Sequence, residues 1–295
     1  MSLPREVIPG RFYMVTRRCT QRQFLLRPDA ETNNGFLYCL AEAAQRCRID
    51  ILLTCAMSNH HHTVIFDRDG TFPAFTEHFH KLVAKSQNAL AGRWENLWAS
   101  EQVCVVHLVD VADVLDKLVY VATNPVKDRL VEKVHHWPGV NGLAALLGGH
   151  SLHATRPRHF FRPDGPMPAA VTLNFVLPRE LGDTSQLLAA LHERVAAVEA
   201  AVAAERMRTG ARILGRRTIL RQSWRGCPVS RAPRRGLRPR LAARNQWARL
   251  EATRRNREFL AAYREARACW LAGAAIPFPV GTYWLRRFAH VPSAS

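Results

Sequence analysis

The stretch IDILLTCAMSNHHHTVIFD, residues 49–67, carries the strongest fold signal in the chain. Residues 49–57 and residues 60–67 are both rich in β-branched and other apolar side chains, and the Ser58-Asn59 dipeptide between them favours a turn. A β-hairpin is therefore predicted. The triplet His60-His61-His62 opens its second strand.

Strand-like and helix-like segments alternate on both sides of this hairpin. The predicted elements are, in order, a strand at 12–19, a helix after Asp29, the hairpin, a long amphipathic helix after Asp69-Gly70, a strand at 103–109, and a helix at 110–124 that Pro125 ends. This β-α-β-β-α-β-α order predicts an α+β fold. Its type is a ferredoxin-like split βαβ sandwich, an antiparallel sheet covered by helices.

The overall composition is that of an ordinary globular chain. Of its 295 residues, 47% are hydrophobic and 22% are charged. No run approaches the about 18 uninterrupted apolar residues of a membrane helix, and the first residues lack the layout of a signal peptide. We therefore expect a cytoplasmic protein with no membrane partner. The seven cysteines are an odd number without a Cys-x-x-Cys pair, which argues against a disulfide framework or a zinc ribbon.

Positive charge is concentrated in the second half of the chain. The formal net charge is +18, yet residues 1–150 hold 16 basic and 15 acidic side chains. Residues 206–257 contain seventeen arginines and a single acid, Glu251. One interpretation is a solvated surface in an arginine-rich protein. Because such a density of like charge opposes compaction, we favour the alternative, contact with a polyanion such as nucleic acid.

Three regions are predicted from these patterns. Residues 1–135 form the α+β domain, residues 136–183 are a Gly/Pro-rich connector, and residues 184–295 are an Arg-rich helical extension that binds nucleic acid. The extension contains helices at 187–208 and 247–270. Between them, residues 212–240 combine Gly, Pro and Arg without apolar periodicity, which indicates an arm that is extended or becomes ordered on a partner.

The histidine triplet is the first candidate site. Side chains alternate between the two faces of a strand, so His60 and His62 share one face and His61 lies on the other. Two imidazoles on one face can chelate a divalent metal. The competing interpretation is that the cluster is packed or solvated polar surface.

Tyr120 and Asn124 form the second candidate site. They are four residues apart on the predicted helix at 110–124, so a phenol and a carboxamide lie on the same face. Tyrosine can act as a nucleophile, and an amide oxygen is a hard metal ligand. Taken alone, Tyr120 can equally be an anchor of an amphipathic helix, and Asn124 a helix cap beside the proline.

Together these residues resemble the HUH endonucleases of the single-tyrosine transposase type, especially the REP-associated tyrosine transposases. The matching strings are TRRCTQRQFLLRPD, AMSNHHHTVIFD and YVATNPVKDRLV, and the resemblance covers approximately residues 10–135. It implies a nuclease domain, often dimeric, that cuts single-stranded DNA next to hairpins. The family's metal-binding histidines correspond to His60 and His62, its nucleophile to Tyr120 and its polar third ligand to Asn124. The middle position of the histidine motif, usually a bulky apolar residue, is His61 here.

The chemistry that the resemblance implies is DNA cleavage and strand transfer. His60, His62 and Asn124 would hold one Mg²⁺ or Mn²⁺, and imidazole ligands favour Mn²⁺. Tyr120 would attack a phosphodiester and keep the 5′-phosphate on its ring oxygen. Because free tyrosine has a pKa of about 10, nearby positive charge is needed to form the phenolate, and the sequence does not identify its source.

Arginines in two regions are candidate DNA contacts. Arginine binds phosphates through a planar fork and stacks on bases. The candidates are Arg17, Arg18 and Arg22 near the N-terminus and Arg216, Arg217, Arg221, Arg225, Arg234 and Arg235 in the extension. Trp224 is placed to stack on unpaired bases, whereas for Trp247 we expect a role as a core anchor.

Two other functions compete with this one. The first is a transposase-derived DNA-binding protein that has lost catalysis and uses only the basic extension. The second is a zinc-dependent hydrolase that combines the histidine triplet with His78 or His80. We predict the transposase, acting on single-stranded or hairpin DNA as a homodimer.

Overall fold

A computed structural model describes residues 4–230 and 239–294 of the chain. The elements of its first part are β1 (Arg11–Arg18), α1 (Ala30–Cys47), β2 (Ile49–Met57), β3 (His60–Asp67), α2 (Phe72–Leu90), β4 (Cys104–Leu108) and α3 (Val111–Lys127). The predicted order of strands and helices is confirmed, and both strands of the hairpin have the predicted bounds. Short 3-10 turns lie at Thr20–Arg22, Val134–His136 and Arg179–Leu181.

Five of the strands in the described residues form the main sheet, in the order β2-β3-β1-β4-β7, where β7 is Leu241–Ala242. Its first four strands are antiparallel, with β1 in the centre between β3 and β4. This is the strand order of a split βαβ sandwich, so the predicted α+β fold class is confirmed. The fifth strand, β7 (Leu241–Ala242), comes from late in the chain and pairs with β4 in parallel.

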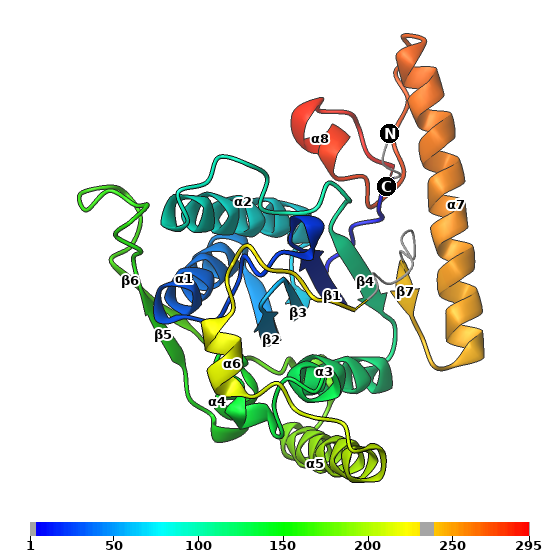
Figure 1. The fold of residues 1–295 in the computed structure, drawn as a ribbon. Coiled ribbons are helices and arrows are strands. Elements are labelled where there is room, and N and C mark those ends of the chain that lie inside the picture. Colours follow the sequence, from blue (N-terminus) through cyan, green and yellow to red (C-terminus); the bar gives the residue numbers. More distant parts are fainter. Residues whose placement is uncertain (1–3, 231–238, 295) are drawn as a thin grey trace.

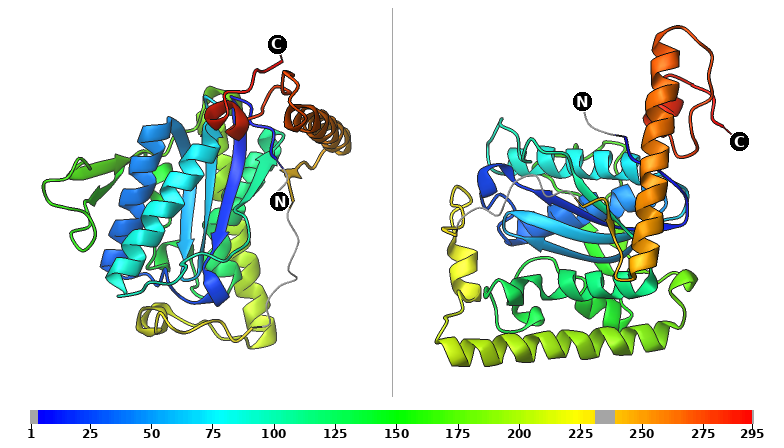
Figure 2. Two further views of the ribbon diagram at one scale, coloured as in Figure 1. Left: turned by 90° about the horizontal axis from the view of Figure 1, so that it is seen from above. Right: turned by 90° about the vertical axis from the view of Figure 1, so that its right-hand side faces the viewer.

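Helices cover both faces of the sheet (Figure 1). On one face α1 and α2 pack over Ile65 of β3, with Phe36 and Phe79 in the same buried cluster. On the other face α3 packs over Val64 and Phe66 of β3. Successive residues of β3 therefore enter different cores, as the pleat of a strand requires. Figure 2 shows α5 (Thr184–Thr209) lying beyond α3 as an outer layer.

A carboxylate marks the beginning of each of two helices. The Asp29 side chain accepts a hydrogen bond from the Thr32 amide at 2.8 Å and caps α1. Asp67, at the end of β3, accepts from the Thr71 amide at 2.8 Å and from the Phe72 amide at 3.1 Å. The hairpin and α2 are thus joined at a fixed angle.

The end of α3 differs from the prediction. The helix continues through Pro125 to Lys127, and Asp128 is its C-terminal cap. Proline lacks an N–H and costs a helix one backbone bond, but so near the end the turn still closes, through the bond from the Asp128 amide to the Asn124 carbonyl at 3.0 Å. Pro125 itself is buried in the core. Asn124 is consequently inside the helix and does not cap it.

The second half of the chain wraps around this sandwich. Its further elements are α4 (Leu143–Gly148), β5 (Leu152–Thr155), β6 (Ala170–Leu173), α6 (Arg216–Arg221), α7 (Gln246–Leu271) and α8 (Trp284–Phe288). The helices predicted at 187–208 and 247–270 are confirmed by α5 and α7. Figure 1 shows α7 standing outside β7, with α8 returning toward α2.

Two expectations for this half are wrong. Residues 216–221 are helical, not extended, because Ile219 is buried and holds α6 against the core. Trp247 is 79% exposed, not a core anchor, since the first turn of α7 extends beyond the surface that buries Phe259 and Ala266. Among the described residues, no helix is both long and apolar enough to cross a membrane.

Candidate active site

The hairpin and α3 bring the two candidate sites together on one face of the sheet. The ring centroids of His62 and Tyr120 are 5.1 Å apart, and those of His60 and His62 are 4.9 Å apart. The alternation of β3 turns both imidazoles toward α3, and Tyr120 meets them from the middle of that helix. Strand and helix residues separated by nearly sixty positions thus form one cluster.

Polar neighbours fix the orientation of both imidazoles. The Nδ1 of His60 is 2.6 Å from Asn59 Oδ1, and Asn59 in turn donates its side-chain N–H to the Arg22 carbonyl at 3.2 Å. The Nδ1 of His62 is 2.7 Å from the hydroxyl of Thr16, its cross-strand partner on β1. Both Nε2 atoms are thereby left available as ligands, the arrangement that outer partners of metal-binding histidines produce.

Asn124 supplies an oxygen beside these nitrogens. Its side chain is buried, with 6% exposed, and interacts with both the His60 ring and the Tyr120 hydroxyl. The Asn124 Oδ1 atom has no hydrogen-bond partner among the described residues. A buried acceptor without a donor is costly, and a cation would satisfy it. Two imidazole nitrogens and one amide oxygen form a donor set that fits Mn²⁺ or Mg²⁺ with positions left for phosphate oxygens.

The electrostatics of the site favour neutral histidines. Burial, together with the positive charge of the Arg18 guanidinium, lowers the pKa of His60 to about 4. Burial also lowers the pKa of His62 well below its usual value. Both rings are therefore neutral near pH 7, the state in which imidazole binds a metal.

The groups around Tyr120 shift the pKa of its phenol in both directions. Burial raises the pKa of its phenol, and the Asp128 carboxylate raises it further. The Asn124 side chain lowers it. Two ammonium groups also lie over the ring, with Lys117 Nζ at 5.7 Å and Lys127 Nζ at 5.5 Å from its centre, and positive charge at this range favours the phenolate. These lysines were missed in the sequence. Their spacing from Tyr120, three residues before and seven after, places them on its face of the helix and could have identified them.

His61 belongs to the opposite face of the sheet. It is fully buried, and its Nε2 is 2.8 Å from His80 Nε2 on α2. The side chain of His78 is occupied by Glu42, at 2.6 Å. The histidines of the alternative zinc hydrolase are thus divided between two faces, and no group of three His, Cys, Asp or Glu side chains suited to a metal occurs in the described parts of the chain.

The three candidate arginines near the N-terminus do not all lie on the same face of the sheet. Arg18 pairs across the strands with His60, and both Arg18 and Arg22 contribute positive charge to the surroundings of that ring. Arg22 is held by hydrogen bonds to the Ser230 carbonyl at 2.6 Å and hydroxyl at 2.9 Å. Arg17 points to the other face, where its guanidinium lies over Trp98 at 5.5 Å.

Arginines of the extension approach the site from the end of α3. The amides of Leu214 and Gly215 bond to the carbonyls of Arg129 and Leu130 at 3.1 and 3.0 Å, which ties the start of α6 to the residues that follow Asp128. The exposed arginines on and after α6 are Arg216, Arg217, Arg221 and Arg225. Arg225 and Arg93 both lie over Trp224, at 5.0 and 5.5 Å. Arg234 and Arg235 lie outside the described residues.

Comparison with known proteins gives structural similarity only. No protein-family model matches the chain, and no curated protein matches it in sequence. The chain is similar in structure to a REP-associated tyrosine transposase bound to a REP hairpin, with a TM-score of 0.43 and 16% identity over 57% of this chain and 93% of that one. A predicted transposase from Deinococcus radiodurans matches with a TM-score of 0.29 and 14% identity over 40% of this chain and 93% of its own. The fold assignment rests on strand order and helix placement, not on these matches.

Proposed function

We propose that the protein is a metal-dependent single-stranded DNA endonuclease and strand-transferase, a transposase that forms a 5′-phosphotyrosine intermediate at Tyr120. One observation carries the proposal: a phenol, two neutral imidazoles held through their Nδ1 atoms and an amide oxygen without a hydrogen-bond partner among the described residues converge on one side of the sheet. Nucleophile and ligands are then within reach of one phosphodiester group.

His60, His62 and Asn124 would hold the Mg²⁺ or Mn²⁺ ion. When bound, the ion would neutralise the charge that develops on the phosphate oxygens. Thr16 and Asn59 keep the two rings in the required orientation through their Nδ1 atoms. Asn124 is one helical turn after Tyr120, so α3 positions a ligand and the nucleophile together.

Tyr120 carries out the covalent step. Its phenolic oxygen bonds to phosphorus, the bond from phosphorus to the 3′-oxygen breaks, and the released 3′-oxygen takes up a proton. The Asp128 carboxylate, whose charge acts on the Tyr120 phenol, would accept the phenolic proton. Lys117 and Lys127 stabilise the phenolate. Attack by another 3′-hydroxyl on the phosphotyrosine reverses the step and joins a new strand without a nucleotide triphosphate.

The DNA would approach across the end of α3. Arg18 and Arg22 lie on the His60 side of the sheet, and the exposed arginines of α6 follow the segment tied to residues 129–130. Arginine side chains of this kind bind phosphates of single-stranded or hairpin DNA in a salt-dependent manner. Assembly as a homodimer is part of the same proposal, and the mass of the purified protein in solution tests it.

The decisive experiment is covalent trapping. Wild-type protein is incubated with Mn²⁺ and a labelled single strand that carries a hairpin, and we expect an adduct that survives SDS. Tyr120→Phe should abolish the adduct. Tyr13→Phe is the matched control, because the Tyr13 side chain is buried on the opposite face of the sheet. If the wild type binds a diverse oligonucleotide pool but forms no adduct with any member, the protein is a DNA binder that has lost catalysis.

A further inference from the structure

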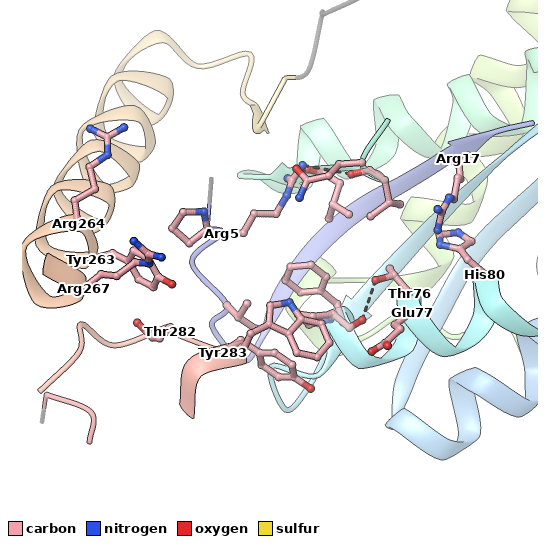
Figure 3. A pocket seen from close by; sticks show the side chains of 18 of the residues that line it. Arg5, Arg17, Thr76, Glu77, His80, Tyr263, Arg264, Arg267, Thr282 and Tyr283 are labelled. Carbon is pink, nitrogen blue, oxygen red and sulfur yellow. Dashed lines mark hydrogen bonds between the residues drawn. The ribbon is translucent and has the colours of Figure 1, made fainter. Parts of the chain in front are cut away.

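A second site lies on the other face of the sheet, away from Tyr120. A cavity of about 770 Å³ opens between α2 on one side and α7 and the segment before α8 on the other. Figure 3 shows Arg17 and His80 on one side of it and Arg264 and Arg267 of α7 on the other, with Tyr283 between the two pairs. Its volume is within the range of sites for small ligands.

A chain of hydrogen bonds determines which proton His80 carries. The chain ends at the His62 carbonyl, which can only accept, so the Thr54 hydroxyl donates to it at 3.3 Å. Thr63 must then donate to Thr54 at 2.8 Å and accept from His61 Nδ1 at 3.1 Å. His61 Nε2 is therefore the acceptor of the 2.8 Å bond, and His80 Nε2 is the donor.

This assignment leaves His80 Nδ1 as a bare acceptor. The atom is buried and has no hydrogen-bond partner among the described residues. The Nε–H of Arg17, a donor, is buried and unpartnered in the same way. Trp98 fixes both residues, since it donates its indole N–H to the His80 carbonyl at 2.8 Å and stacks under Arg17. Two residues that line the cavity thus carry one unsatisfied donor and one unsatisfied acceptor, both just below its surface.

The remaining walls combine aromatic rings with positive charge. Phe72, Tyr263, Tyr283 and Trp284 line the cavity, and Trp284 is 42% exposed. Four arginines contribute to the lining against one carboxylate, that of Glu77. Aromatic faces bind flat rings, and arginines bind phosphate.

We propose that this cavity binds a nucleotide. The base lies against Tyr283 and Trp284, and its edge supplies an acceptor to Arg17 and a donor to His80 after a small rotation of the Arg17 side chain. The phosphate lies toward Arg264 and Arg267. Thymine has the required edge, because a ring carbonyl adjoins a ring N–H. The site lies on the face opposite Tyr120, so it goes beyond the proposed cleavage activity. A nucleotide of this chemistry comes either from an unpaired position of a strand or from solution.

The test separates the base from the backbone. The Tyr120→Phe protein is used in EDTA, so that neither cleavage nor metal contributes, and binding of a labelled pentathymidylate is compared with that of an abasic strand of the same length and charge. We expect the thymine strand to bind about 10-fold more tightly or better, in line with stacking on aromatic side chains. Equal binding of the two strands overturns the proposal.

Paired substitutions locate the effect. Trp284→Ala should reduce the preference for thymine by about 5-fold or more, whereas Arg264→Ala should weaken binding of the thymine strand by about 5-fold through loss of a phosphate contact. Trp247→Ala and Arg257→Ala are the matched controls, because both residues are exposed on α7 and lie outside the cavity lining. If Trp284→Ala behaves like Trp247→Ala, the proposal fails. Photocrosslinking with 5-iodo-dUMP and mass spectrometry gives an independent readout, with adducts expected on Tyr283 or Trp284 and adducts confined to other regions contradicting the site.

The same experiment distinguishes the two sources of nucleotide. Displacement of the labelled strand by millimolar dTMP indicates that the cavity accepts a free nucleotide, and base-dependent strand binding that dTMP does not displace indicates an unpaired position of the DNA. Failure here is separable from failure of the proposed function. A covalent adduct at Tyr120 without base-dependent binding rejects only the cavity, and the reverse result rejects only the cleavage activity.

Discussion

The two lysines that flank Tyr120 provide a quantitative test of the proposed chemistry. Lys117→Met and Lys127→Met remove one ammonium group each and keep the length of the side chain. Both ammonium groups lie within 5.7 Å of the ring centre. Because a positive charge stabilises the phenolate over the phenol, each substitution should lower the fraction of phenolate at a given pH and slow adduct formation.

The distances set the size of the effect. At 5.5 Å the attraction between two unit charges is about 3 kcal/mol with an effective dielectric constant near 20, and about 0.8 kcal/mol with that of water. Tyr120 is half-buried and Lys127 is exposed, so the value for each lysine lies between these limits. Expressed as a rate at fixed pH, each substitution should slow adduct formation by about 3-fold to 100-fold.

The assay is the rate of adduct formation from pH 6 to pH 10 with saturating DNA and Mn²⁺. The double variant should reach its maximal rate at a higher pH than the wild type. Lys85→Met is the matched control, an exposed lysine on α2 across the sheet. If the double variant loses DNA affinity but keeps the wild-type pH profile, the lysines bind phosphate only, and the account of Tyr120 activation is refuted.

Three further outcomes are expected. Asn124→Ala should weaken Mn²⁺ binding about 10-fold or more in titrations followed by electron paramagnetic resonance, whereas Asn124→Asp should retain it; equal affinity in all three proteins would remove Asn124 from the ligand set. Burial lowers the pKa of His61 to about 3, so the unfolded chain takes up a proton that the folded chain excludes as the pH falls below about 6.5, and stability should decrease by about 1.4 kcal/mol per pH unit from this group. In urea denaturation between pH 7 and pH 5, His61→Leu should show a shallower decrease than the wild type, and parallel curves would contradict this. Phe79→Ala, which empties a fully buried ring position between α2 and the sheet, should cost about 3–5 kcal/mol in the same assay, and a loss below about 1 kcal/mol would show that the core there is loosely packed.

Local patterns in the sequence were sufficient for the sandwich and for most of the candidate site. The hairpin at residues 49–67 was predicted with both strand bounds, because two β-rich runs flank a clear turn dipeptide. The strand period placed His60 and His62 on one face, and the helical period placed Tyr120 beside Asn124. His61 stands where the histidine motif usually has an apolar residue. The same strand period explains its position, because its side chain enters the core on the opposite face of the sheet.

Features that depend on distant contacts were not predictable in this way. Proline at position 125 indicates a helix end by local rules, but the buried environment of Pro125 allows one more turn. Amphipathic spacing shows that α7 has an apolar face, but it does not show how much of the length of α7 is covered by other residues. Trp247 was therefore predicted to be a core residue and is exposed. The cavity joins Arg17 with Arg264, and no sequence period connects residues so far apart.

Segments from other parts of the chain form hydrogen bonds along β4 and β2. Along β4, Arg5 donates to the carbonyls of Val103 and Val105, and the amides of His107 and Val109 bond to Arg240 and Ala242. Along β2, the backbone is bonded by Val140, Gly142 and Val176. Unpaired sheet edges allow strands of other molecules to add to them, and these segments cover the backbone of β2 and β4 where that could occur. Two copies of the protein that paired their sheets through β2 or β4 would first have to displace these segments.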